Sequence, residues 1–89
     1  MACRIEYKSS VLRELKHLER NIAKRIIDDL RDSLAMDPNC GEPLSGQFRG
    51  LYKLRVGDYR VIYSRTRDGV LILRIGHRSV VYESHIPHF

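Results

Sequence analysis

With 89 residues, of which 43% are hydrophobic and 30% charged, the chain has the size and composition of one globular domain (1–89) rather than of a disordered segment. No apolar run approaches the roughly 20 residues of a membrane-spanning helix, so no membrane contact is expected. Residues 1–10 contain no apolar signal-peptide core, and we therefore expect a cytoplasmic protein.

The formal net charge of +5 is unevenly distributed along the chain. Residues 1–48 balance 8 Lys or Arg against 8 Asp or Glu. Between residues 49 and 78, only Asp58 and Asp68 oppose Arg49, Lys53, Arg55, Arg60, Arg65, Arg67, Arg74 and Arg78. A positive field confined to one segment indicates a polyanionic partner, either nucleic acid or an acidic protein.

The first half of the chain predicts one strand followed by a helical hairpin. Residues 3–7 alternate like a strand, and Ser9 and Ser10 are suited to cap a helix. Asn21 is the expected cap of a second helix, which should end before Pro38 because the residue before proline resists the α conformation. The apolar stripes of the two helices are Val11, Leu12, Leu15 and Leu18, and Ile22, Ile26, Leu30 and Leu34.

The second half predicts a loop and an antiparallel meander. Residues 37–50 are rich in proline and glycine and read as a loop. Three alternating segments then follow, with turns at Gly57-Asp58 and Asp68-Gly69: 51–56, 59–65 and 70–78. The predicted fold is therefore α+β in the order βααβββ, an N-terminal strand and helical hairpin packed on an antiparallel sheet.

Strict alternation assigns each strand residue to one of two faces of this sheet. The expected core face contains Tyr52, Leu54, Val56, Tyr59, Val61, Tyr63, Leu71, Leu73 and Ile75. The opposite face contains Lys53, Arg55, Arg60, Ile62, Ser64, Ile72, Arg74 and Arg78. No acidic residue is assigned to the interior of this second face, and like charges on neighbouring strands repel. We therefore expect the face to bind an anion.

Three segments carry a family resemblance. GLYKLRVGDYRVIY (50–63), IGHRSVVYES (75–84) and the preceding PLSG (43–46) resemble, in this order and spacing, the RelE/ParE superfamily of toxins from toxin–antitoxin pairs. The resemblance implies a RelE-like, microbial-RNase-like fold and a cognate antitoxin as partner. The superfamily includes RelE-like endonucleases that cut messenger RNA on the ribosome and ParE-like inhibitors of DNA gyrase.

The nuclease branch of the superfamily has cations on the sheet and an aromatic or imidazole group near the C-terminus. Lys53, Arg55 and Arg60 match the sheet cations, Arg78 matches the cation at the end of the last strand, and Tyr82 matches the terminal tyrosine. Two features depart from the pattern: Arg55 stands where some relatives have lysine, and the stretch from Arg78 to Tyr82 is shorter than in some.

Cleavage of RNA without a metal uses the 2′-OH as nucleophile and leaves a 2′,3′-cyclic phosphate. Guanidinium groups donate paired hydrogen bonds to phosphate, so Arg60 and Arg78, assisted by Arg55, are expected to stabilise its charge. Lys53 is the preferred general base, since neighbouring cations disfavour its charged form, with His77 and Tyr82 as other proton-transfer candidates. Arg49 and Arg74 are expected to bind RNA.

No metal and no cofactor are expected. Cys3 and Cys40, the two cysteines, show no metal-ligand spacing, and His85 and His88 alone do not complete a coordination shell. Two alternatives to a nuclease stay open at this stage. A ParE-like gyrase inhibitor would share the fold without needing the basic constellation, and a non-catalytic RNA-binding module would keep the basic face.

Overall fold

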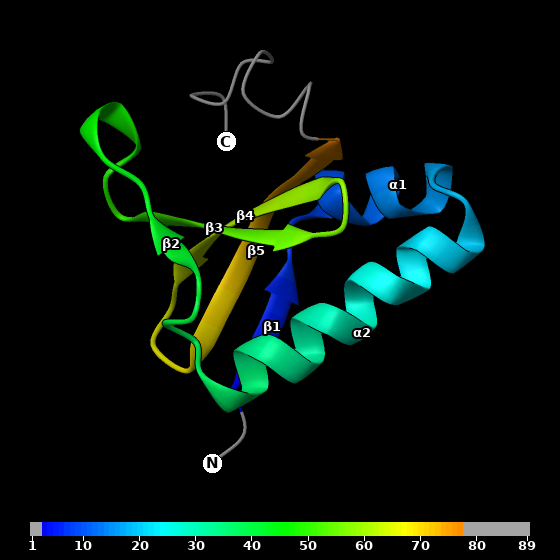
Figure 1. Ribbon diagram of the computed structural model, residues 1–89. Helices are drawn as coiled ribbons and strands as arrows, with labels where there is room; N and C mark the ends of the chain where they lie inside the picture. The colour runs from blue at the N-terminus through cyan, green and yellow to red at the C-terminus, as the bar shows by residue number, and fades with distance from the viewer. Residues whose placement is uncertain (1–2, 78–89) are drawn as a thin grey trace.

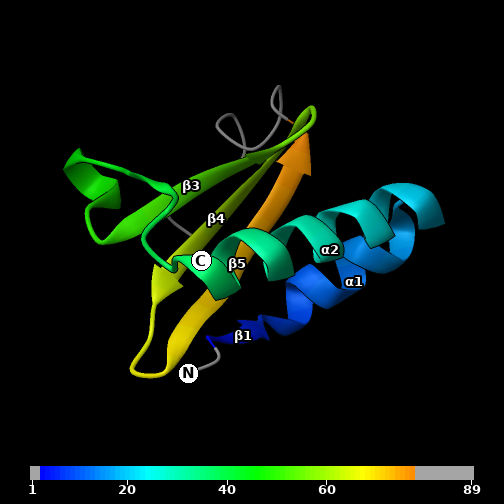
Figure 2. The same ribbon diagram turned by 60° about the horizontal axis from the view of Figure 1, so that its bottom comes forward.

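The computed structural model describes residues 3–77, in which two helices cover one face of a five-stranded sheet (Figures 1 and 2). In chain order, the elements are β1 (Arg4–Tyr7), α1 (Ser9–His17), α2 (Arg20–Met36), β2 (Glu42–Pro43), the 3₁₀ turn η1 (Gly46–Phe48), β3 (Leu51–Val56), β4 (Tyr59–Arg65) and β5 (Gly69–His77). The strand order is β1-β5-β4-β3-β2, with β1 parallel to β5 and the other pairs antiparallel. The predicted α+β fold is confirmed.

Both helices begin at positions other than the predicted caps. The N-cap of α1 is Lys8 and that of α2 is Glu19, and neither makes a side-chain capping bond. The connection between the helices is extended only around Leu18 and Glu19, so α2 starts before Asn21. The predicted end of the second helix before Pro38 is confirmed, because α2 stops at Met36.

The core lies between the helices and the sheet. It consists of Val11, Leu15, Ile26, Leu30 and Leu34 from the helices, packed on Val56, Val61, Tyr63, Val70, Ile72 and Ile75 from the strands. Neither helix is long and apolar enough to cross a membrane.

A β-bulge in β5 changes the faces of the last strand. Ile62 pairs with Arg74 but its neighbour Tyr63 pairs with Ile72, so Leu73 is an extra residue with no partner on β4. On the N-terminal side of Leu73 the alternation is reversed relative to the prediction. The assignment of Leu71 and Leu73 to the core is therefore wrong, and Ile72, fully buried, takes that place.

The segment 37–50, predicted as a loop, contains β2 and η1. Hydrogen bonds to Tyr63 hold it against the core. The fully buried Tyr63 hydroxyl accepts a hydrogen bond from the Gly41 backbone N–H at 3.0 Å and donates one to the Pro38 carbonyl at 3.1 Å. A Cβ at Gly41 would lie 2.4 Å from this hydroxyl oxygen, so only glycine fits there. This anchor holds β2 beside β3 at the edge of the sheet.

Candidate functional site

The open face of the sheet, the side away from the helices, carries the predicted cations in rows set by the strand register. Three rows cross the strands: Glu42–Lys53–Ile62–Arg74, Arg55–Arg60–Gly76 and Leu51–Ser64–Leu71. Directly paired residues on antiparallel strands have Cα atoms about 4.5–5.5 Å apart. The register thus brings Lys53, Arg55, Arg60 and Arg74 together on one face, as the alternation predicted.

Arg55 and Arg60 face each other across β3 and β4. Arg55 is exposed, whereas Arg60 is only 8% exposed and donates a long, 3.5 Å hydrogen bond from Nη1 to the Tyr59 carbonyl. Two guanidinium groups in one cross-strand pair repel each other, and a bound anion would relieve this repulsion. The pair is therefore a candidate anion site in which Arg60 is nearly buried and Arg55 is accessible.

Lys53 lies between an acid and an apolar residue. Its Nζ is 3.4 Å from Oε2 of Glu42, its partner on β2, and its side chain is 27% exposed. None of the strand positions assigned to this face is acidic, but β2 adds a fifth strand that periodicity did not show, and this strand brings Glu42 to the face. Glu42 is 70% exposed, so the pair is well screened and open to exchange with another anion.

An apolar cluster covers part of the open face. Ile62 is fully buried there under Leu44, Phe48 and Leu51, which places η1 over the sheet beside Lys53. Arg49 follows η1 and is exposed. The sequence analysis did not predict this cover, and Phe48 was not singled out as a site residue.

His77 lies on the other side of the sheet. Its ring makes an edge-to-face contact with Tyr59, with centroids 5.8 Å apart, and Tyr59 packs against the core. His77 also lines a hollow together with Glu14 and His17 of α1. The structure therefore does not bring His77 together with Lys53 and Arg55. Arg78 and Tyr82 lie outside the described residues.

No group of three or more His, Cys, Asp or Glu side chains within residues 3–77 is placed to hold a metal ion. Cys3 and Cys40 are free thiols. Burial, reinforced by the nearby Asp37 carboxylate, raises the pKa of Cys40, which disfavours the nucleophilic thiolate.

The helical hairpin on one face of a small sheet and the cations on the other agree with the RelE/ParE resemblance of the sequence. The model of the family described as ParE toxin of type II toxin-antitoxin system, parDE, matches residues 5–82. Toxin RelE of Mycobacterium tuberculosis (strain ATCC 25618 / H37Rv) is 35% identical over 78 residues, covering 83% of this chain and 79% of the relative. The chain belongs to the RelE/ParE superfamily of type II toxin–antitoxin toxins.

Solved structures agree with this assignment. The toxin–antitoxin complex RelBE2 from Mycobacterium tuberculosis contains a chain that superimposes with a TM-score of 0.80 at 26% identity, covering 89% of this chain and 94% of that one. The archaeal RelE–RelB complex from Pyrococcus horikoshii OT3 gives a TM-score of 0.69 at 28% identity, with 90% and 99% covered. The family resemblance read from the three segments is confirmed.

Proposed function

We propose that the chain is a cytoplasmic endoribonuclease that cleaves messenger RNA on the ribosome and acts as the toxin of a toxin–antitoxin pair. The observation that carries the proposal is the Arg55–Arg60 pair on the open face, beside Lys53. Three cations on adjacent strands give a phosphate group several donors at once. Membership of a toxin family in which RelE is a relative supports the same activity.

In the proposed reaction, the RNA 2′-OH loses its proton and its oxygen attacks the adjacent phosphorus. The bond from phosphorus to the 5′-oxygen breaks, that oxygen gains a proton, and a 2′,3′-cyclic phosphate remains. Arg55 and Arg60, with Arg78 as a further donor expected from the resemblance, stabilise the charge on the phosphate oxygens. This chemistry needs no metal cofactor.

Lys53 is the proposed general base, with Tyr82 as an alternative from the resemblance. Lys53 forms an ion pair with Glu42, so the proposal requires RNA binding to separate the two side chains. His77 is not assigned a role in this proposal because it lies against Tyr59 on the helix side. Arg49 and Arg74 are proposed to hold RNA on either side of the cut.

A cognate antitoxin is the proposed protein partner. The structural relatives from Mycobacterium tuberculosis and Pyrococcus horikoshii are toxin chains in complexes with antitoxins. The basic open face suits an acidic partner as well as RNA.

The test is cleavage of messenger RNA on programmed ribosomes under single-turnover conditions. Arg55→Ala should lower the rate by roughly 10²–10³, the usual effect of losing one donor to transition-state charge. Arg55 is exposed, so the variant should stay folded. Arg13→Ala, which removes an exposed cation from α1, is the matched control and should cut at the parent rate. Equal rates for Arg55→Ala and the parent would refute the site.

A gyrase-directed toxin is the second candidate, and the description of the matching family model as a ParE toxin favours it. Supercoiling by purified gyrase in the presence of the chain separates the two proposals. Inhibition of supercoiling without RNA cleavage would establish the ParE-like activity. RNA binding with neither effect would identify the third alternative, a non-catalytic RNA-binding module.

A further inference from the structure

Along β3 and β4, the open face changes from basic to apolar. The Arg55–Arg60 pair lies near the turn between these strands, and the next row on the same face pairs Lys53 with Ile62. Neighbouring rows on one face are two residues apart, which is about 7 Å along the strand. Ile62 is fully buried under an apolar cover made by Leu44, Phe48 and Leu51. Cations and an apolar cluster therefore lie about one row apart on the open face.

Phe48 is the aromatic residue of this face. Within residues 3–77, the other phenylalanine and tyrosine side chains pack in the core on the helix side: Tyr7, Tyr52, Tyr59 and Tyr63. Phe48 ends η1 and packs against Ile62, yet it remains partly exposed to solvent, and Arg49 after it is exposed. Phe48 is thus an accessible aromatic group on a face rich in cations.

We propose that Phe48 is a stacking platform for one base of the bound RNA, and that a neighbouring phosphate occupies the Arg55–Arg60 pair. This role rests on the proposed function, because it takes the anion on the open face to be an RNA phosphate. A nucleotide has a negative phosphate at one end and a flat aromatic base at the other, and the open face offers the matching groups in the same order. Aromatic side chains bind single-stranded RNA by stacking, and all four bases have a face that stacks. Phe48 therefore contributes affinity and register, and little selectivity among the bases.

The segment that carries Phe48 has a glycine on each side of it. Gly46 (φ +65°) and Gly50 (φ +93°) adopt the left-handed conformation that glycine reaches without steric cost, and an added Cβ would meet no atom within 4 Å at either position. The Leu44 N–H donates to the Leu51 carbonyl at 2.9 Å, which fixes the start of the segment to β3. Small rotations at the two glycines can therefore admit a base beside the Phe48 ring without breaking the pairing of β3 with β4.

Packing on Ile62 would by itself explain an apolar residue at position 48, and Phe48→Leu separates the two roles, because leucine covers Ile62 but has no aromatic face. The probe is a labelled single-stranded RNA with 2′-O-methyl riboses, which lack the attacking hydroxyl and are not cut. Fluorescence anisotropy with the full chain should show binding weakened about tenfold in Phe48→Leu, the usual order for losing one stacked base. Tyr59→Leu removes an aromatic ring from the helix side and should bind like the parent.

Replacing one nucleotide at a time by an abasic ribose identifies the stacked base. In the parent, one abasic position should weaken binding about tenfold. In Phe48→Leu, the same abasic position should cause no further loss, because the ring that it would contact is already gone. Exchanging the base at this position for any of the other three should change the affinity of the parent far less than removing it.

A tryptophan at position 48 gives a direct signal. The chain contains no tryptophan, so Phe48→Trp introduces a single indole at the platform. This variant should bind RNA at least as well as the parent, and RNA should quench its fluorescence through stacking. Leu12→Trp, at an exposed position of α1, is the control and should show no quenching. Phe48→Trp also decides the outcome if Phe48→Leu does not fold.

Three results would overturn the platform: parent affinity in folded Phe48→Leu, an equal abasic loss in Phe48→Leu and the parent, or no quenching in Phe48→Trp while RNA is bound. Cleavage on programmed ribosomes separates these failures from failure of the nuclease proposal. If the parent shows the expected coupling between Phe48 and one base but cuts no RNA, the nuclease proposal fails and the platform stands. If it cuts RNA without this coupling, the platform is wrong and the nuclease stands. No binding up to about 1 mM RNA, together with no cleavage, would refute both.

Discussion

At the scale of single residues, Tyr63 links the core to the segment that borders the open face. Its ring is fully buried and stacks on Tyr52 at 5.4 Å, and its hydroxyl joins Gly41 to Pro38. This one side chain therefore positions β2, and through β2 the Glu42 carboxylate beside Lys53.

Tyr63→Phe should destabilise the fold by about 1–3 kcal/mol, because it leaves the buried Gly41 N–H and the Pro38 carbonyl without their partner. Chemical denaturation measures the loss. Tyr52→Phe is the matched control: its ring stacks on Tyr63, but its hydroxyl makes no hydrogen bond within residues 3–77. A similar loss in both variants would show that packing, not the hydroxyl, matters.

Tyr63→Phe should also change how the stability of the fold depends on pH. Burial raises the pKa of Tyr63 above its ordinary value of 10.0. The neutral phenol is thus favoured in the folded chain. The contribution of Tyr63 to the free energy of unfolding is fully present below pH 10 and declines as the pH rises through the higher pKa of the folded state. Stability of the parent should fall above pH 10, and Tyr63→Phe should show a smaller fall, since phenylalanine does not titrate.

The sequence analysis placed three cations on the open face but missed Glu42, and both outcomes have physical reasons. Lys53, Arg55 and Arg60 followed from alternation because β3 and β4 are regular and joined by a tight turn at Gly57, where φ is +59°. Glu42 did not follow, because a strand of two residues has no period to detect. Its place beside Lys53 depends on the distant contact of Gly41 with Tyr63.

At the scale of elements, β1 and the bulge of β5 depend on contacts far apart in the chain. β1 pairs in parallel with the first residues of β5, and the Arg4 backbone leaves no room for a Cβ at Gly69. Asp68-Gly69 was recognised as a turn. The alternation of apolar and polar residues, however, indicates neither the parallel pairing of β5 with β1 nor the extra residue Leu73. A register shift of one residue was enough to reverse the predicted faces of Leu71 and Ile72.

Gly69→Ala should detach β1 from the sheet. An added Cβ would lie 1.9 Å from the Arg4 carbonyl oxygen, so the strands must separate, at a cost of about 1–3 kcal/mol. Gly46→Ala is the control, since Gly46 has φ +65° and open space around it, and the left-handed alanine costs about 1–2 kcal/mol. Hydrogen exchange of residues 4–7 should accelerate well beyond the global change only in Gly69→Ala. Retained protection of β1 in that variant would contradict the close approach.

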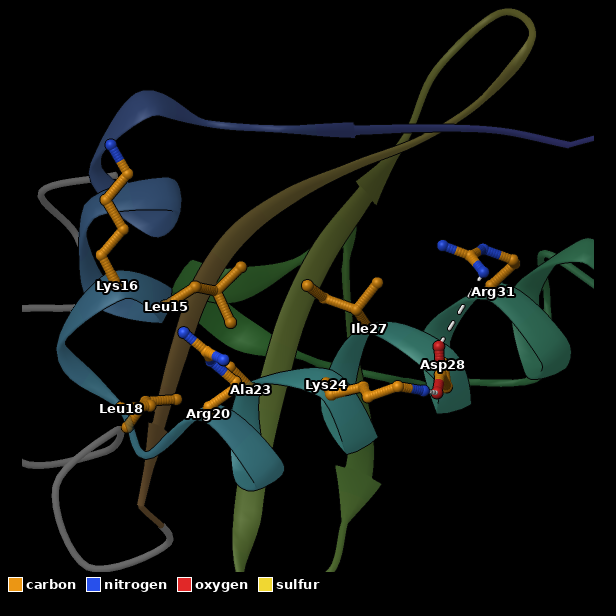
Figure 3. A pocket seen from close by; sticks show the side chains of 9 residues that line it. All are labelled: Leu15, Lys16, Leu18, Arg20, Ala23, Lys24, Ile27, Asp28 and Arg31. Carbon is orange, nitrogen blue, oxygen red and sulfur yellow. Dashed lines mark hydrogen bonds and ion pairs between the residues drawn. The ribbon is translucent and has the colours of Figure 1, made fainter.

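At the scale of the whole molecule, two separate basic surfaces lie on opposite sides of the sheet. The excess of positive charge in residues 49–78 was visible in the sequence, and this segment includes the cations of the open face, Lys53, Arg55, Arg60 and Arg74. A second basic surface, the groove between α1 and α2 lined by Lys16, Arg20, Lys24 and Arg31 (Figure 3), was not visible there, since residues 1–48 are balanced in charge. Folding separates these charges: Asp29 and Asp32 lie outside the groove that Lys16 and Arg20 line.

If RNA binds only to the open face, the salt dependence of binding should identify the cations involved. Each phosphate neutralised on a single strand releases counterions, and the slope of log K against log salt changes by about 0.7 per contact. Arg55→Ala should therefore make the slope shallower by about 0.7. Lys24→Ala and Arg13→Ala each remove one positive charge from the helical layer. Each lowers the net charge by as much as Arg55→Ala does, but both should leave the slope unchanged. Fluorescence anisotropy of a labelled single-stranded RNA over a series of KCl concentrations measures the three slopes. A shallower slope in the helical variants would mean that RNA also contacts the helical layer, and the assignment of RNA binding to the open face alone would then be wrong.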